Sequence, residues 1–451
     1  MLRRRYLMLD QFENYIKENK MCSPRDKILL GVSGGVDSMV MMDLFLQKNY
    51  RIGIVHCNFR LRGSESEDDK KFVESVAKEK KIPFYTKEFD TENYARENSM
   101  SVQMAARELR YSWFNEIKQK NAYQYLAIGH NLDDVVETFF INLNRGTGIR
   151  GLTGIKPVYG DIIRPILFAS RKEILKYAKS ENLKYREDSS NIETKYIRNK
   201  IRHDIIPEFD QLNPDFSKII IETIERLRDA EIFLDNSIEK IKSDLIIEQS
   251  SNRILIDIDK LKILKPVNTV LYEIIRDYGF NYETVKNIIS TFADTPGKKF
   301  YSKTHRIIKD RSFLIITDIE KVDDTATKIK ADIAEIATPV SLSFNKFKRP
   351  ENYNIPKEAK YAVLDFNKIR YPLELRKWRQ GDRFIPLGMN NFKKLSNFFI
   401  DYKLSIPDKE AVWIITSGAD IIWIVNHRID DRFKVDIDTR EILVIEYKEN
   451  D

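Results

Sequence analysis

Short apolar runs alternate with stretches of helical periodicity through the first half of the chain. Runs of strand length lie at residues 27–32, 52–56, 83–89, 125–129 and 162–166, and helical patterns lie at 38–47, 67–80, 103–120 and 133–144. Ser170 and Glu173 form the capping box of one more helix. Strands that alternate with helices are typical of a parallel sheet covered by helices. The pattern predicts an α/β domain with a doubly wound, mostly parallel sheet over residues 1–210.

The second half of the chain carries two other patterns. A charged amphipathic helix is expected at 215–245, helical segments at 266–278 and 282–291, and a closing hairpin from alternating runs at 299–308 and 312–317. Strand-like runs return at 340–344, 361–364, 373–378, 411–416 and 421–426. We therefore expect a mostly helical middle domain at 211–324, a linker at 325–337, and a small β-rich α+β domain at 338–451.

Composition and charge narrow the class of protein. A chain of 451 residues is too long for one ordinary core. The net charge of +7 permits an anionic partner without requiring one. Cys22 and Cys57 cannot form a disulfide framework, and the absence of an export signal or a long apolar run predicts a cytoplasmic protein without a membrane span.

A hydroxyl-rich and glycine-rich hexapeptide, Ser33-Gly34-Gly35-Val36-Asp37-Ser38, joins the first strand to the first helix. The start of a helix binds anions through its free N–H groups, and glycine lets the backbone approach phosphate oxygens. No lysine lies between residues 32 and 47, so this is not a Walker A loop. Asp37 would repel phosphate unless a divalent cation lies between them, so Mg²⁺ is expected with a nucleotide. An ordinary helix N-cap is the alternative.

Other charged residues follow strands at the same expected edge of the sheet. His56 ends the second strand, where it either contacts the nucleotide or only completes the local hydrogen bonding. Arg107 and Arg110 share one helix face, which suits phosphate binding or simply a solvated surface.

The fourth strand ends in Gly129 and His130, and an acidic group follows it. Asp133 and Asp134 suit Mg²⁺ or a substrate amine, unless one of them only caps the helix, and Glu137 lies one turn later. Asp134 is our first candidate for a general base, with Glu137 second.

In combination these motifs resemble a known enzyme family. The hexapeptide resembles the PP-loop of the N-type ATP pyrophosphatases, whose fold is the adenine nucleotide hydrolase-like sheet. Across nearly all of residues 27–207, the order of the motifs resembles the tRNA(Ile)-lysidine synthases. The blocks that carry this likeness further include Arg145, Asp188, Asn191, Arg198, Asn199 and Arg202, and in the C-terminal domain Arg379, Arg383, Lys393 and Lys394.

The resemblance implies ligation of free L-lysine to the wobble cytidine of a tRNA(Ile) with a CAU anticodon, with ATP and Mg²⁺. It assigns nucleotide binding to Ser33–Ser38, His56, Gly129 and His130, catalysis to Asp37, Asp133, Asp134, Glu137 and Arg110, and Mg²⁺ to Asp37 and Asp134. Arg107 and the residues of the further blocks would contact tRNA or lysine. Phe59 departs from the pattern, because many members carry a histidine there.

Some questions stay open at this point. The long helix at 215–245 suits pairing within one chain or between two, so a homodimer is one expected assembly. Cys57 is expected to be a small packing residue. The rival hypotheses are a PP-loop enzyme that thiolates tRNA or amidates a small molecule, and an inactive nucleotide-sensing RNA-binding protein.

Overall fold

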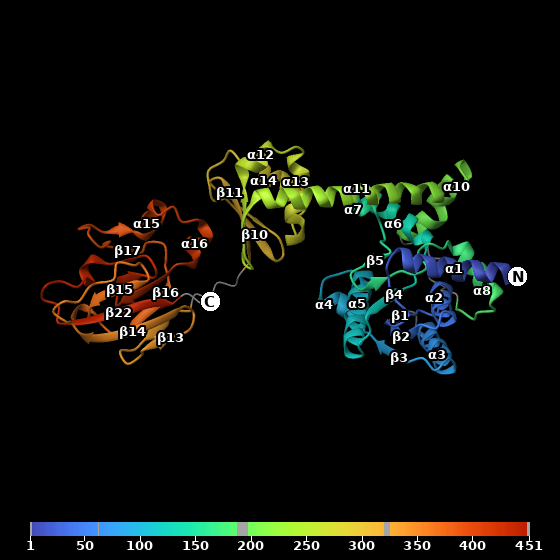
Figure 1. The fold of residues 1–451 in the computed structure, drawn as a ribbon, viewed down its shortest axis with the longest axis horizontal. Helices are drawn as coiled ribbons and strands as arrows, with labels where there is room; N and C mark the ends of the chain where they lie inside the picture. Colours follow the sequence, from blue (N-terminus) through green and yellow to red (C-terminus); the bar gives the residue numbers. More distant parts are fainter. Residues whose placement is uncertain (1, 62, 187–196, 320–324, 449–451) are drawn as a thin grey trace. The chain divides into compact units, whose positions relative to one another are not determined.

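A computed structural model of the chain describes residues 2–61, 63–186, 197–319 and 325–448 (Figure 1). The chain divides into two compact units, Met1–Asp235 and Asn236–Asp451. The first unit extends past the expected boundary at residue 210, because Ile220 and Ile224 of helix α11 (Phe216–Leu245) pack with Val135 and Phe139. None of the described helices is long and apolar enough to cross a membrane.

The first unit contains the predicted, mostly parallel sheet. Its strands are β1 (Lys27–Gly31), β2 (Arg51–Asn58), β3 (Phe84–Glu88), β4 (Tyr125–Ile128), β5 (Val158–Tyr159) and β6 (Ile162–Ile163), in the order β3-β2-β1-β4-β6-β5. Only β5 runs antiparallel to its neighbour. The chain moves outward from β1 to β2 and β3 and then returns to place β4 on the other side of β1. Parallel sheets bind ligands at such a switch point, beyond the carboxyl ends of the strands.

Helices cover both faces of this sheet. One face packs against α1 (Leu2–Glu18), α2 (Val36–Gln47), α3 (Ser64–Glu79) and α8 (Arg171–Ser180), and the other carries α4 (Thr91–Glu97) and α5 (Val102–Lys120). Ile28 and Leu30 of β1 face the first layer, while Leu29 between them packs with Trp113 and Phe114 of α5. Burial on both sides explains why this strand is apolar at successive positions.

Further helices complete the unit at the edge where β4 ends. They are α6 (Leu132–Arg145), α7 (Ile149–Leu152), α9 (Ile197–Lys200), the π-helix η2 (Ile201–Ile205) and α10 (Ile206–Leu212). The strand expected at 162–166 is shorter than predicted. Pro165 has no N–H for a ladder, and the chain turns there with a hydrogen bond from Leu167 N to Arg164 O (3.2 Å).

The second unit begins with the expected helices and with a sheet of which only the closing hairpin was predicted. Its helices α12 (Ile258–Ile263), α13 (Val267–Ile275), η3 (Arg276–Tyr278) and α14 (Tyr282–Ser290) pack with an antiparallel sheet of β7 (Ile246–Gln249), β8 (Arg253–Asp257), β9 (Lys299–Tyr301), β10 (His305–Asp310) and β11 (Phe313–Asp318). The predicted hairpin is β10–β11, with Arg311 at a φ of 43° in its turn. Strands β7 and β8 were not predicted, because β7 follows α11 with no turn residue between them.

The rest of the second unit is β-rich, as predicted. One sheet contains β12 (Thr327–Ile329), β16 (Leu373–Lys377), β19 (Trp413–Ser417), β20 (Asp420–Ile424) and β21 (Arg428–Ile429). A second contains β13 (Glu335–Ile336), β14 (Ser341–Lys348), β15 (Tyr361–Asp365) and β22 (Glu441–Lys448). A ribbon of β17 (Arg383–Phe384) and β18 (Lys393–Lys394) and the helices α15 (Leu395–Asp401) and α16 (Ile406–Ala411) accompany them.

The segment 325–337 is not the unstructured linker that we expected. Its strand β12 pairs with β16, and its strand β13 pairs with β14. Ile329 is fully buried in the core that the two sheets share. A polar sequence with small residues therefore concealed two edge strands, each too short to show a clear alternation.

Candidate active site

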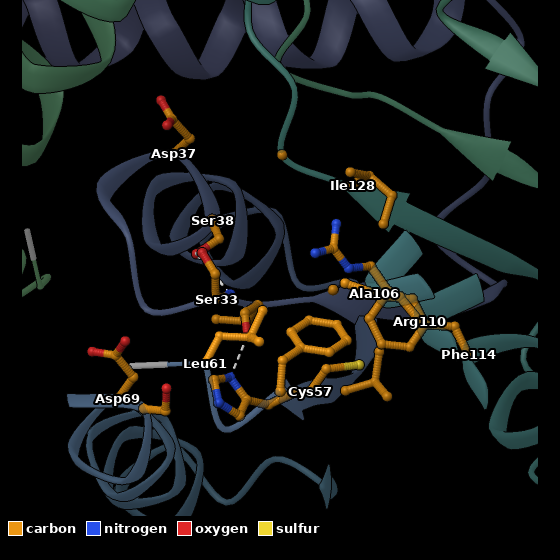
Figure 2. A pocket seen from close by; sticks show the side chains of 17 residues that line it. Ser33, Asp37, Ser38, Cys57, Leu61, Asp69, Ala106, Arg110, Phe114 and Ile128 are labelled. Carbon is orange, nitrogen blue, oxygen red and sulfur yellow. Dashed lines mark hydrogen bonds between the residues drawn. The ribbon is translucent and has the colours of Figure 1, made fainter. Parts of the chain in front are cut away.

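A cavity of about 440 Å³ lies beyond the carboxyl ends of β1, β2 and β4 (Figure 2). Its polar lining includes Ser33, Asp37, Ser38, His56, Ser66, Asp69 and Arg110, and its apolar lining includes Val55, Cys57, Phe59, Leu61, Ala106, Phe114 and Ile128. Such a cavity has an apolar wall for a flat ring and a polar end for an anion. It coincides with the switch point of the sheet.

The hexapeptide after β1 forms the polar end of this cavity. Gly34 adopts a φ of +95°, which strains any residue with a side chain. Gly35 is the N-cap of α2 and has no side chain to occupy the N–H groups of the first turn. The Ser33 and Ser38 hydroxyls lie 3.3 Å apart, and Ser38 donates to the Gly35 carbonyl (2.9 Å). The loop therefore presents hydroxyls and free backbone donors to an anion.

The loop after β4 lies directly against this hexapeptide. A Cβ at Gly129 would meet the Cα and N of Ser38 at 3.3 Å, so only glycine allows this approach without displacement. Asn131 Nδ2 donates to Asp37 Oδ1 (3.1 Å). The ends of β1 and β4 are thus held together by close packing and by one hydrogen bond.

Asp37 and Asp133 share a cationic partner that the sequence did not reveal. The Arg171 guanidinium forms an ion pair with Asp37, and the Arg171 backbone N–H donates to Asp133 Oδ2 (2.7 Å). Figure 2 shows the Asp37 side chain pointing away from Ser33 and Ser38. The sequence did contain an indication of this pairing. Arg171 is the first residue of α8, at the positive end of the helix, where a cation is unfavourable without a carboxylate partner.

Asp134 caps its helix and also belongs to a buried ionic cluster. Asn131 is the N-cap of α6, and Asp134 completes a capping box with it. Its other oxygen accepts from Arg198 (2.9 Å). Burial raises the pKa of the Asp134 carboxyl, and nearby Glu137 and Asp37 add to this effect.

Glu137 is the centre of that cluster. Its side chain is 1% exposed, and its two oxygens accept from Arg198 (2.7 Å) and Arg202. Both predicted arginines therefore reach the acidic group, from α9 and η2. Two guanidinium groups therefore fix this buried carboxylate and compensate its charge.

The side wall of the cavity contains two other predicted residues. His56 Nδ1 lies 2.8 Å from the Val32 carbonyl, and burial lowers the pKa of this imidazole. His56 is thus a hydrogen-bonded strand-end histidine that also lines the cavity. The Arg110 guanidinium lies over the Phe59 ring (5.2 Å), and Phe59 stacks on Phe89 (5.7 Å). Phe59 contributes aromatic surface where a histidine was expected.

Several predicted residues lie apart from the cavity. Arg107 and Arg145 are exposed, and Arg107 lies over the Tyr111 ring (4.9 Å). Asp188 and Asn191 lie outside the described residues. Asn199 belongs to α9, between Arg198 and Lys200.

The predicted basic residues of the second unit gather on the β17–β18 ribbon. Arg383 lies opposite Lys394 in the register, and both are exposed, as is Arg379 nearby. Lys393 forms an ion pair with Asp401. Phe384 is fully buried and cannot face a ligand, whereas Phe392 is exposed beside Arg383 (5.2 Å).

Three parts of the chain match known protein families. Residues 8–209 match the family described as PP-loop domain, residues 249–319 the TilS substrate binding domain, and residues 373–446 the TilS substrate C-terminal domain. A tRNA(Ile)-lysidine synthase of Parabacteroides distasonis is 38% identical over 98% of this chain and 100% of its own length. One of Bacteroides thetaiotaomicron is 36% identical over 95% of this chain and 97% of its own. Among solved structures, the U34-tRNA thiolase NcsA from Methanococcus maripaludis is 22% identical with a TM-score of 0.41, over 49% of this chain and 79% of that one.

Proposed function

Because the chain belongs to the tRNA(Ile)-lysidine synthase family, we propose that it joins free L-lysine to C2 of the wobble cytidine in a CAU-anticodon tRNA(Ile). It is a ligase that uses ATP, and its products would be lysidine, AMP and pyrophosphate. The observation that carries the proposal is that the loop Ser33–Ser38 and the acidic cluster of Asp134 and Glu137 lie side by side. The anion-binding loop and the acidic cluster meet through Asn131, which caps α6 and donates to Asp37.

The first step would activate the cytidine. Its C2 oxygen attacks the α-phosphorus of ATP, an O–P bond forms, and the bond to the β-phosphate oxygen breaks. The leaving pyrophosphate needs donors that are already oriented, and the Ser33 and Ser38 hydroxyls with the start of α2 supply them. The apolar wall of Phe59, Phe114 and Ile128 suits the adenine ring.

The second step would join the lysine. The ε-amine attacks C2, the C–N bond forms, and the C2–O bond breaks to release AMP. An amine with an ordinary pKa of about 10.4 must first lose a proton, which needs a carboxylate close by. Asp134 is the better candidate because burial raises the pKa of its carboxyl, which favours accepting a proton, and because it accepts from one arginine whereas Glu137 accepts from two.

The carboxylates also suit Mg²⁺ that arrives with ATP. Among the described residues, no group of three or more His, Cys, Asp or Glu side chains forms a metal cage. Mg²⁺ commonly takes one or two carboxylates together with substrate phosphates and water, and Asp37 and Asp134 are the two carboxylates proposed for it. The ion would supply charge neutralisation on the phosphates.

The thiolation alternative lacks a reactive thiol among the described residues. Burial raises the pKa of the Cys57 thiol to about 12, and that of Cys22 to about 12 as well. A thiol in this range stays protonated at neutral pH and is a poor nucleophile. Cys57 packs beside the apolar cluster of α5, in agreement with the role expected from the sequence.

The exposed cations of the β17–β18 ribbon, Arg383 and Lys394, are proposed to contact the tRNA backbone. We also propose that the enzyme acts in the cytoplasm, where its substrate occurs. A homodimer is the assembly to test, because Ile219 and Ile232 of α11 are exposed. Light scattering that gives the mass of one chain would contradict a dimer.

Pyrophosphate release tests the proposed reaction. We expect release to require an unmodified CAU-anticodon tRNA(Ile), and Asp37→Asn to abolish it while the unit remains folded by circular dichroism. Ser75→Ala is a matched control, because Ser75 lies on the exposed side of α3 and its hydroxyl bonds only its own helix. Undiminished release by Asp37→Asn would refute the assignment of the loop.

A further inference from the structure

Arg164 is a buried arginine beside the active site that the motifs did not identify. It follows β6 and is 8% exposed. Its Nε donates to His130 Nδ1 (3.2 Å), and one terminal nitrogen donates to the Lys156 carbonyl (2.7 Å). The guanidinium is therefore fixed on both sides, by a backbone carbonyl and by an imidazole.

This contact determines where the proton of the imidazole lies. A guanidinium donates and never accepts at neutral pH, so His130 Nδ1 must be the accepting nitrogen. The neutral ring then carries its proton on Nε2. A doubly protonated ring would direct an N–H at another N–H and place two cations side by side, which is unfavourable in a buried position.

The position of His130 links it to the phosphate end of the cavity. Its neighbour Gly129 packs on the backbone of Ser38, and its other neighbour Asn131 bonds Asp37. In the part of the chain that the structure describes, no residue accepts a hydrogen bond from Nε2. The charges that lower the pKa of the ring belong to arginines, first Arg164 from the end of β6, then Arg198 from α9 and Arg107 and Arg110 from α5.

A ring that accepts from Arg164, and whose Nε2–H has no acceptor among the described residues, matches an anionic acceptor. Phosphate oxygens accept hydrogen bonds and do not donate them when ionised, so they require the Nε2–H form. The same surroundings disfavour a protonated imidazole, and burial with these arginines lowers the pKa of His130 to about 3. His130 would thus remain a neutral donor throughout the physiological pH range.

We propose that Arg164 is a positioning residue that holds His130 as a neutral Nε2–H donor to the phosphate groups of ATP and of the adenylated intermediate. The inference rests on the proposed function for the identity of the acceptor. The tautomer of His130 itself follows from the contact with Arg164, whatever the acceptor is.

Nuclear magnetic resonance can read this state directly. The chain has five histidines, so two-bond ¹H–¹⁵N spectra of ¹⁵N-histidine protein are tractable, and the His130→Asn spectrum assigns the signal. In the unaltered protein we expect Nδ1 unprotonated, Nε2 protonated, and no titration between pH 5.5 and 8, well above the pKa of about 3. A proton on Nδ1, or titration near the ordinary value of about 6.5, overturns the proposal.

Arg164→Met tests the causal role of the arginine. The ring should then lose its fixed tautomer, and its pKa should rise only in part, because burial, the largest cause of the low pKa, remains. Removing the orienting partner of a functional histidine typically costs about 10- to 100-fold, so pyrophosphate release at pH 8 should fall by this factor. The Nδ1 and Nε2 signals of His130 should show a mixture of the two tautomers, which a purely structural loss would not produce.

Arg228→Met is the matched control. Arg228 also donates to backbone carbonyls, of Thr153 (3.3 Å) and Ile155 (2.6 Å), but does not contact His130. It should change thermal stability and leave the His130 signal unchanged. If Arg164→Met fails to fold, the tautomer in the unaltered protein still decides the question. If lysine ligation itself fails, the tautomer result stands, so the two failures are distinguishable.

Discussion

Gly35→Ala separates binding of the phosphates from stability of the fold. Gly35 has a φ of −71°, and an added Cβ would meet only the Ser33 hydroxyl, at 3.5 Å, which is ordinary contact. Alanine is a poorer N-cap than glycine, at a cost of about 0.5–1 kcal/mol, and it stabilises by about 0.4–1 kcal/mol through the unfolded chain. These terms nearly cancel. The melting temperature should therefore change by no more than about 2 °C.

ATP binding should respond much more strongly to the same change. The Cβ would occupy the space through which a phosphate reaches the backbone donors of the loop. Loss of one hydrogen bond to a charged group costs about 1.5–3 kcal/mol, which corresponds to about 10- to 150-fold in Kd. The measurement is calorimetric titration with α,β-methylene ATP, which resists cleavage at the expected bond.

Gly148→Ala is the control for this experiment, because Gly148 is also a helix N-cap and has nothing within 4 Å of an added Cβ. Its affinity for the ATP analogue should equal that of the unaltered protein. If Gly35→Ala bound the analogue as tightly as the control does, phosphates would not approach this loop and the reasoning would be refuted.

Two other variants test the remaining surfaces. Phe59→Ala should destabilise the first unit by about 2 kcal/mol, since the ring is half-buried, and it should raise the KM for ATP. An unchanged melting temperature in calorimetry would contradict the stacking of Phe59 with Phe89 and Arg110. Lys394→Ala should weaken tRNA binding and reduce the slope of log K against log salt by about 1. Lys393→Ala should have a smaller effect, because the charge of Lys393 is paired with Asp401. If filter binding gave the two variants equal slopes, the result would contradict this assignment.

Local features of the fold were predictable from sequence. The strand, loop and helix around Ser33–Ser38 are adjacent in the chain, and the alternation of patterns was sufficient for a parallel sheet. Very short elements could not be predicted from the sequence. Strands β12 and β13 have three and two residues, too few for a periodic signal. The burial of Phe384 likewise depends on α15, which packs over it.

The partners within the site were the least predictable part. Arg171 bonds Asp37 across 134 positions of the chain, and Arg198 bonds Glu137 across 61. A sequence identifies residues with the right chemistry, but it does not pair a carboxylate with one guanidinium among many. His56 illustrates the same limit, because its bond to Val32 forms only when β1 and β2 pair.

The most direct test of the central claim is transfer of labelled lysine to RNA. The enzyme is incubated with ¹⁴C-lysine, ATP, Mg²⁺ and an unmodified CAU-anticodon tRNA(Ile) transcript, with an elongator methionine tRNA as control. The account predicts label in the isoleucine transcript, at the wobble cytidine, and none in the methionine tRNA. Absence of label from both transcripts, with ATP and folded enzyme present, would contradict it.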